Sequence, residues 1–226
     1  SVAAINGSLK VIQWLASKGC NIHQIDDHND NALNFAVWGG YFDTVKWLAD
    51  QKCNIHQINK DKDNALTLAA AEGHFEQIQW LASQGCNIHQ TNNDKDNAFT
   101  LAVERGHLEL AKWLADQGCD IHQIQNNGNN AVTLAVSRGD LDTVKWLASQ
   151  GCNIHHVDIN GDNALIMASR FRHHELLSLL AEKGVAIDHI NDKGETALSI
   201  AMQQKAINIA CELIKRGADV SLGVMP

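Results

Sequence analysis

The sequence lacks several features that would point to a function at once. Lys and Arg number 18 against 26 Asp and Glu, and the resulting net charge of −8 argues against nucleic-acid binding, which needs a basic face. The chain has no run of 18 apolar residues, and its first residues lack a charged segment followed by an apolar one. The sequence therefore predicts no nucleic-acid partner, no membrane partner and no signal peptide.

Catalytic motifs are missing as well. The chain contains no Gly-x-Ser-x-Gly, no phosphate-binding Gly-x-x-x-x-Gly-Lys and no His-Glu-x-x-His. Ser, His and Asp are present, but no spacing places a set of them together. We predict that the chain is not an enzyme, with no catalytic residues and no cofactor.

What the sequence does contain is a repeat of 33 residues. Such a period is typical of a solenoid of stacked supersecondary units. A residue that recurs in register is therefore first a structural position and only then a candidate for chemistry. Three residue types recur at this interval: Trp14, Trp47, Trp80, Trp113 and Trp146; Cys20, Cys53, Cys86, Cys119 and Cys152; and His23, His56, His89, His122 and His155.

One unit, residues 92–124, shows the local structure that the repeat predicts. It opens with a polar, Asx-rich turn, after which Asn97 is a plausible N-cap for a helix that ends at Gly106. A second apolar helix is expected over 108–116, ended by Gly118. The unit thus reads turn, helix, short turn, helix and loop, which predicts an all-α fold.

These units resemble the ankyrin repeat. The family pattern includes Asp-x-x-Gly-x-Thr-Pro-Leu and, after the second helix, Gly-Ala-Asp-Val-Asn. The last unit matches it best, with Asp192-Lys193-Gly194-Glu195-Thr196-Ala197-Leu198 and Gly217-Ala218-Asp219-Val220. The resemblance covers essentially the whole chain. It implies an all-α solenoid of helix-turn-helix pairs joined by hairpin loops. It also implies a monomer that binds another protein in a concave groove formed by the hairpin tips and the first helices.

The register of the repeat sets the expected organisation. Residues 1–25 correspond to the second helix and loop of a partial repeat, and 224–226 are a short tail. We expect further repeats or another domain before residue 1. The alternative function is accordingly the target-selecting region of a larger enzyme or of a secreted bacterial effector. The six full repeats are 26–58, 59–91, 92–124, 125–157, 158–190 and 191–223.

The chain departs from the family pattern in three ways. Ala replaces the family's Pro in every repeat. A Trp replaces an aliphatic residue of the second helix, two residues before an Ala that replaces Leu. We expect the indole to fill the space released, so that Trp113→Ala would cost about 3–5 kcal/mol if the ring is buried. Arg172 and Lys205 replace the glycine between paired helices, which predicts strained left-handed residues and early fraying at that end.

The cysteine and histidine columns have a structural and a chemical interpretation. Neighbouring repeats lie about 8–10 Å apart, whereas a disulfide needs Cα atoms within about 7 Å. We therefore predict buried thiols in a reducing, cytoplasmic compartment, of this cell or of a host cell. The Cys-x-x-His pairs do not converge on one metal ion, and we predict imidazoles that satisfy loop backbone groups. A metal- or redox-responsive module is the rival interpretation.

Candidate partner contacts are the residues that vary from repeat to repeat at positions expected to be exposed. They lie at the ends of the first helices and on one hairpin tip. Aromatic residues and Arg are enriched in binding hot spots, and packing of Trp38 on a neighbouring repeat is the alternative for that residue. The predicted contacts are Trp38, Arg105, Arg138, Arg170, Phe171, His28, Glu72 and Glu104.

Overall fold

The computed structural model describes residues 2–222 and divides the chain into two compact units, one ending at Asp120 and one beginning at Ile121. The predicted tail, 224–226, lies outside the described residues. Within them the chain forms fourteen helices, and the only β-structure is an isolated antiparallel bridge between Val157 and Asn163. The predicted all-α fold is confirmed.

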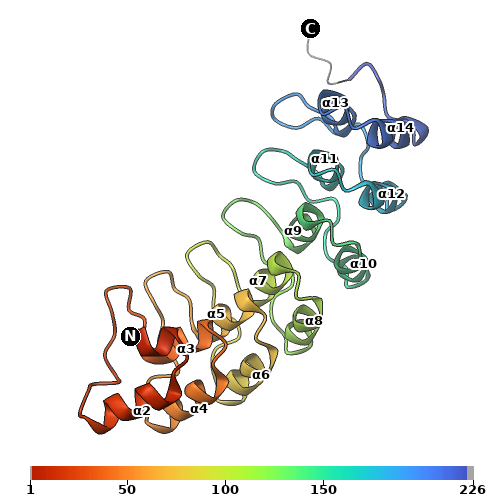
Figure 1. Cartoon of the computed structure of the whole chain (residues 1–226). Coiled ribbons are helices and arrows are strands. Elements are labelled where there is room, and N and C mark those ends of the chain that lie inside the picture. The colour runs from red at the N-terminus through yellow and green to blue at the C-terminus, as the bar shows by residue number, and fades with distance from the viewer. Residues whose placement is uncertain (1, 223–226) are drawn as a thin grey trace. The chain divides into compact units, whose positions relative to one another are not determined.

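The N-terminal unit is a row of helix pairs. Its first helices α1, α3, α5 and α7 pack successively against one another, and each is followed by an antiparallel second helix (Figure 1). The hairpin loops of this unit all project to the same side of the row. The helices are α1 (Val2–Ile5), α2 (Leu9–Ser17), α3 (Ala32–Trp38), α4 (Phe42–Asp50), α5 (Ala65–Glu72), α6 (Phe75–Ser83), α7 (Ala98–Arg105) and α8 (Leu108–Asp116).

The C-terminal unit repeats this arrangement. Its first helices α9, α11 and α13 pack in succession, and the second helices α12 and α14 also contact each other. The helices are α9 (Ala131–Arg138), α10 (Leu141–Ser149), α11 (Ala164–Arg170), α12 (His174–Glu182), α13 (Ala197–Gln203) and α14 (Ile207–Lys215).

An asparagine begins each first helix from α3 to α11, as the sequence predicts. In α5 the Asn64 Oδ1 accepts hydrogen bonds from the N–H groups of Leu66 and Thr67, while Thr67 Oγ1 accepts one from the Asn64 N–H. Such a cap contributes about 1 kcal/mol. The Asn64 Nδ2 also donates to the carbonyl of Asn87, at 2.8 Å. One side chain therefore starts the helix and ties it to the loop of its own repeat.

Apolar side chains shared by successive helices form the core of each unit. The first helices are buried along most of their length, whereas the second helices bury one face only. Each fully buried aliphatic or aromatic side chain contributes about 1.5–3 kcal/mol. The largest are Leu33, Leu48, Leu66, Ile78, Leu81, Phe99 and Leu114 in the N-terminal unit, and Leu147, Leu165, Ile166, Leu176 and Leu177 in the C-terminal unit.

The indole column is not buried, contrary to the condition set for the cost of Trp113→Ala. Trp14 is 59% exposed, and Trp47, Trp80, Trp113 and Trp146 are half-buried. The indoles lie toward the solvent side of the second helices. Trp80 and Trp113 pack edge-on against the phenyl rings of Phe42 and Phe75, each at 5.9 Å between centroids. Such a pair contributes about 0.5–1.5 kcal/mol beyond its buried area, so truncation costs less than a core aromatic would.

Candidate partner-binding surfaces

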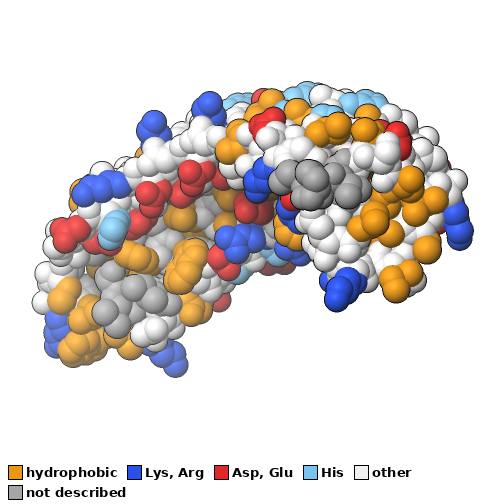
Figure 2. Space-filling model, turned by 90° about the horizontal axis from the view of Figure 1, so that it is seen from above, with side chains coloured by type: hydrophobic (Ala, Val, Ile, Leu, Met, Phe, Trp, Pro, Cys, Tyr) orange, Lys and Arg blue, Asp and Glu red, His pale blue; other side chains and the backbone are white. Residues whose placement is uncertain are grey.

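Main-chain hydrogen bonds hold successive hairpin tips together. The N–H of Lys60 donates to the carbonyl of His28, and the N–H of Asn93 donates to the carbonyl of Asp61, both at 2.8 Å. In the C-terminal unit, the N–H of Asp192 donates to the carbonyl of Asn160 at 3.1 Å. Because these hydrogen bonds use backbone atoms only, they fix the backbone of the tips whatever side chains the tips carry. Seen from the hairpin side, acidic side chains (red) form a row beside hydrophobic ones (orange) (Figure 2).

The predicted contacts of the N-terminal unit lie at the ends of its first helices. Trp38 is 52% exposed at the end of α3, and Glu72 and Arg105 are exposed at the ends of α5 and α7. Glu104 is half-buried beside Arg105, and His28 is exposed on its hairpin tip. These residues occupy variable positions of successive repeats, so the side chain presented to solvent differs from one repeat to the next.

A column of three carboxylates lies at the base of the hairpins in the same unit, formed by Asp30, Asp63 and Asp96. They are one repeat position, 33 residues apart. Asp30 Oδ1 accepts a hydrogen bond from Asn34 Nδ2 at 2.8 Å, and Asp96, only 5% exposed, accepts one from Thr100 Oγ1 at 2.9 Å. Among the described residues, no ion pair joins Asp30 or Asp63 to a cationic side chain.

The middle carboxylate of this column is electrostatically strained. Burial raises the pKa of the Asp63 carboxyl above its ordinary value. Hydrogen bonds from Thr67 and Asn92 oppose the rise, whereas the nearby Asp61 and Asp96 carboxylates add to it. Burial and the neighbouring carboxylates therefore both disfavour the charged form of Asp63.

The C-terminal unit places a cation at the corresponding position. Arg170 Nη2 lies 2.9 Å from Asp162 Oδ2 and 3.1 Å from Glu195 Oε2. Asn191 Nδ2 donates to both carboxylates, at 2.6 Å to Asp162 Oδ1 and 3.0 Å to Glu195 Oε2. Although burial opposes it, Glu195 and Asp162 raise the pKa of Arg170. Arg170, a predicted partner contact, thus has its guanidinium engaged inside its own unit.

The other predicted contacts of this unit are solvent-accessible. Arg138 is exposed at the end of α9. Phe171 is 48% exposed immediately after α11, and its ring stacks on the imidazole of His173 at 6.2 Å between centroids. Phe171 therefore presents one face to solvent from a supported position.

The cysteine column is buried in four of its five copies. Cys53, Cys86, Cys119 and Cys152 are buried, and each thiol donates to the carbonyl of the isoleucine 31 residues earlier, at 3.5–3.8 Å. Burial raises the pKa of Cys86 and of Cys119 to about 11. Such thiols stay protonated at neutral pH and are poor nucleophiles. Cys20, the first copy of the column, is exposed.

The histidine column lies at the surface: the side chains of His23, His56, His89, His122 and His155 are exposed. Asparagine side chains bond the backbone of these loops. Asn54 Oδ1, for example, accepts a hydrogen bond from the His56 N–H, and Asn31 Nδ2 donates to the Asn54 carbonyl. Among the described residues, no three His, Cys, Asp or Glu side chains are placed to hold a metal ion.

Four other histidines make inter-repeat bonds. His74 and His173 Nε2 lie 3.1 and 3.0 Å from the carbonyls of Trp38 and Ser137, near the interhelical turn of the preceding repeat. His156 and His189 Nε2 lie 2.6 and 2.7 Å from the carbonyls of Gly128 and Gly161, in the preceding hairpins. The 33-residue spacing of His156 and His189 is the sequence signal that could have identified this pair.

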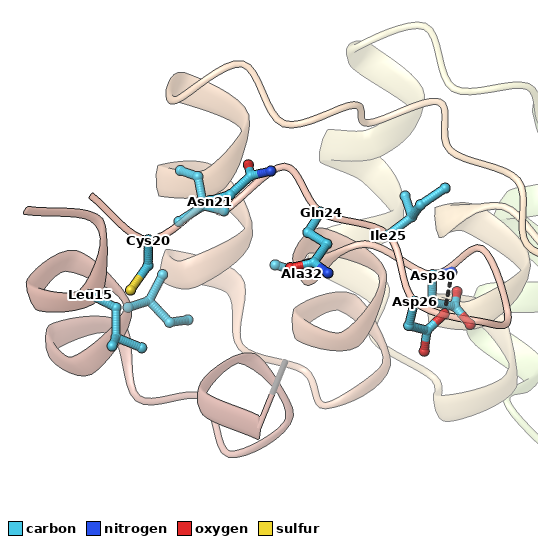
Figure 3. Close-up of a pocket in the computed structure, with 10 residues that line it drawn as sticks. Leu15, Cys20, Asn21, Gln24, Ile25, Asp26, Asp30 and Ala32 are labelled. Carbon is cyan, nitrogen blue, oxygen red and sulfur yellow. Dashed lines mark hydrogen bonds between the residues drawn. The ribbon is translucent and has the colours of Figure 1, made fainter. Parts of the chain in front are cut away.

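A pocket of about 290 Å³ lies in the N-terminal unit between α2 and the first hairpin (Figure 3). Leu15 and Cys20 lie at one side, and Asp26 and Asp30 at the other. Although desolvation opposes it, the N–H groups of Asp30 and His28 lower the pKa of the Asp26 carboxyl. These hydrogen bonds close the hairpin itself, and the lining residues contain no base paired with a nucleophile. We assign this pocket no catalytic role.

Comparison with known proteins identifies the family. A sequence profile described as ankyrin repeats in three copies matches residues 1–92, 43–125, 66–158 and 132–223, so the chain belongs to the ankyrin repeat family. The crystal structure of the human ASB11 ankyrin repeat domain aligns with a TM-score of 0.81 at 22% identity, covering 96% of each chain. That likeness establishes the solenoid fold. No curated protein sequence matches significantly.

Ankyrin repeats generally mediate protein–protein interactions, and the fold is typically non-catalytic. None of the described helices combines the length and the apolar character needed to cross a membrane.

Proposed function

We propose that this chain binds a partner protein through its hairpin tips and the exposed ends of its first helices. One observation carries the proposal. Side chains at the surface change type from one repeat to the next, whereas the core and turn positions beneath them repeat. Trp38, Ala71 and Glu104 occupy one position, as do Gly39, Glu72 and Arg105. A surface that served only solubility would need neither the exposed indole of Trp38 nor the exposed phenyl ring of Phe171.

The N-terminal unit favours a partner segment with an apolar and a basic side chain. Trp38 offers an aromatic surface, and the carboxylates of Asp30 and Asp63 lie at the hairpin bases of the same unit. In the C-terminal unit, Arg170 supplies from within the chain the cation that equivalent carboxylates accept. Arg138 and Phe171 are the proposed contacts there. The same surfaces would bind the target if these repeats select substrates for a catalytic domain elsewhere in a longer protein.

Affinity capture with matched variants tests the proposal. One face variant combines Trp38→Ala with Glu72→Lys, and a second combines Arg138→Glu with Phe171→Ala. The control combines Gln79→Lys with Lys145→Glu, two exposed changes on the second helices. We expect one protein to be recovered equally by the wild type and the control, and at least tenfold less by a face variant, about 1.4 kcal/mol of binding. Equal recovery by all face variants, or loss with the control alone, refutes the proposed surface.

A further inference from the structure

The turn between paired helices forms a pocket in both units, and the two pockets differ in charge. In the N-terminal unit it is lined by Gly40, Phe42 and the start of α6, including His74 and Glu76. In the C-terminal unit a pocket of about 430 Å³ is lined by Arg172, His174, Lys205 and the first turn of α14. The two pockets occupy the same place in the repeat, 132 residues apart.

Every change of charge between the two pockets goes in the same direction. Arg172 stands in the place of Gly40, His174 in that of Phe42, and Asn208 in that of Glu76. Lys205 stands in the place of Gly73. The C-terminal pocket thus gains two cationic side chains and loses the one carboxylate, whereas the imidazole of His174 is offset by the exchange of His74 for Ala206.

A coordinated exchange makes room for Arg172. At Gly40, Gly73 and Gly139 the interhelical glycine lies under a histidine ring: a Cβ at Gly40 would meet His74 at 2.7 Å, and one at Gly139 would meet His173 at 2.5 Å. The counterpart of those histidines over Arg172 is Ala206, which lines the pocket. Arg172 (φ 62°) and Lys205 (φ 55°) keep the left-handed backbone of the glycines they replace, as the sequence predicts.

Gln204 holds the Arg172 guanidinium in position. Arg172 Nε donates to Gln204 Oε1 at 3.1 Å, and Nη2 donates to the Gln204 carbonyl at 2.7 Å. Gln204 Nε2 in turn donates to the Arg170 carbonyl, the bond that His74 and His173 make in their own repeats. A neutral partner orients the guanidinium without cancelling its charge, so the cation is pre-organised for an anion.

No carboxylate of the residues that the structure describes lines the pocket, and Glu212 of α14 pairs with Arg216. Glu175, next to His174 in the sequence, is exposed and does not line the pocket. Among the described residues, Arg172 and Lys205 take part in no ion pair.

We propose that the pocket formed by Arg172, His174, Lys205 and Asn208 binds an oxyanion group, either a phosphate or a carboxylate. Arg offers a planar pair of donors to such a group and Lys a compact charge beside it. Asn208 can donate through its amide. The pocket lies at an interhelical turn beside Phe171, one of the proposed protein contacts, but the inference does not depend on protein binding because its test uses small oxyanion probes.

Backbone amide NMR titrations of the whole chain test the proposal. The probes are inorganic phosphate, end-blocked phosphoserine and end-blocked glutamate, at constant ionic strength. We expect saturable shifts at Arg172 and Lys205–Ile209 with at least one probe, and the probe that saturates first identifies the source of the oxyanion. Gly73–Gln77, in the corresponding N-terminal pocket, should not respond. Equal responses in both pockets, or no saturable response to any probe, overturn the proposal.

The double variant Arg172→Gly, Lys205→Gly restores the residue found at this position in the other repeats. It should fold with an unchanged or higher Tm, because glycine adopts the left-handed backbone without strain. We expect its affinity for the best probe to fall about tenfold or more, since two charge-assisted contacts are lost. A folded double variant that binds the probe as the wild type does would also refute the site.

Discussion

The hairpin bases of the two units hold their carboxylates in different ways. In the N-terminal unit, Asp30 and Asp63 accept hydrogen bonds from neutral groups, and the nearby Asp96 carboxylate adds to the raised pKa of Asp63. The C-terminal unit places Arg170 between Asp162 and Glu195. In the described part of the chain, the same repeat position therefore holds carboxylates outside any ion pair at Asp30 and Asp63, and an ion network in the other unit. The difference indicates that Asp30 and Asp63 can attract a basic partner, whereas Asp162 and Glu195 serve the stability of their own unit.

Charge composition agrees with this contrast. Residues 1–120 carry nine Lys and Arg against fifteen Asp and Glu, whereas residues 121–226 carry nine against eleven. Most of the chain's net negative charge thus belongs to the N-terminal unit, which contains Asp30 and Asp63. A basic partner segment would be attracted to that unit first, and more weakly at high salt.

Removing the cation from the C-terminal network should have the largest effect. Arg170→Ala leaves Asp162, which is buried, and Glu195 without their positive partner, and it should destabilise the C-terminal unit by about 2 kcal/mol. Hydrogen exchange of the whole chain would show faster opening of α11 and α13 with α5 unchanged. Unchanged exchange in α11 would contradict the role of the network.

The same variant should change the response to acid. Asn191 and Arg170 hold the pKa of Glu195 below its ordinary value of 4.5. A depressed folded-state pKa contributes stability above the unfolded value, and that stability is lost as the pH falls through the folded pKa. The wild-type C-terminal unit should therefore lose more stability between neutral pH and pH 3 than the variant does.

Adding a cation beside the carboxylates of the N-terminal unit should raise the free energy of unfolding, by less than Arg170→Ala lowers it. Ala71 occupies the position of Arg170, and Ala71→Arg would place a guanidinium near Asp63 and Asp96. We expect a gain of about 0.5–1 kcal/mol in the free energy of unfolding, seen as slower exchange in α5 and α7. Ala71→Gln, of similar length and without charge, is the control. An equal gain from both changes would assign the effect to packing instead.

Neutralising the Asp63 carboxylate should give the smallest change in the free energy of unfolding. Because the folded-state pKa of Asp63 is raised, its contribution to stability declines as the pH rises through that pKa. Asp63→Asn should therefore stabilise the N-terminal unit by about 0.5 kcal/mol at neutral pH. The difference from wild type should shrink as the pH falls below the raised pKa. Denaturant unfolding across this pH range measures it, and a difference independent of pH would exclude the electrostatic cause.

The repeat period made the fold predictable from the sequence. It did not predict which side chains point to solvent. Asn64, Asn97 and Gly106 have local roles fixed by neighbouring residues, and the structure confirms them. The exposure of His56 and Trp113 depends on which layer a side chain faces, which periodicity alone does not reveal. The Arg170 network joins residues 8 and 25 positions apart, and only the packing of successive repeats brings them together.

The main-chain ties between hairpin tips have an evolutionary consequence. The bonds from Lys60 to His28 and from Asn93 to Asp61 use atoms that nearly every amino acid possesses. Mutation at a tip can thus alter what the surface recognises while the alignment of adjoining loops persists. Selection can explore new specificities one side chain at a time without first repairing the scaffold.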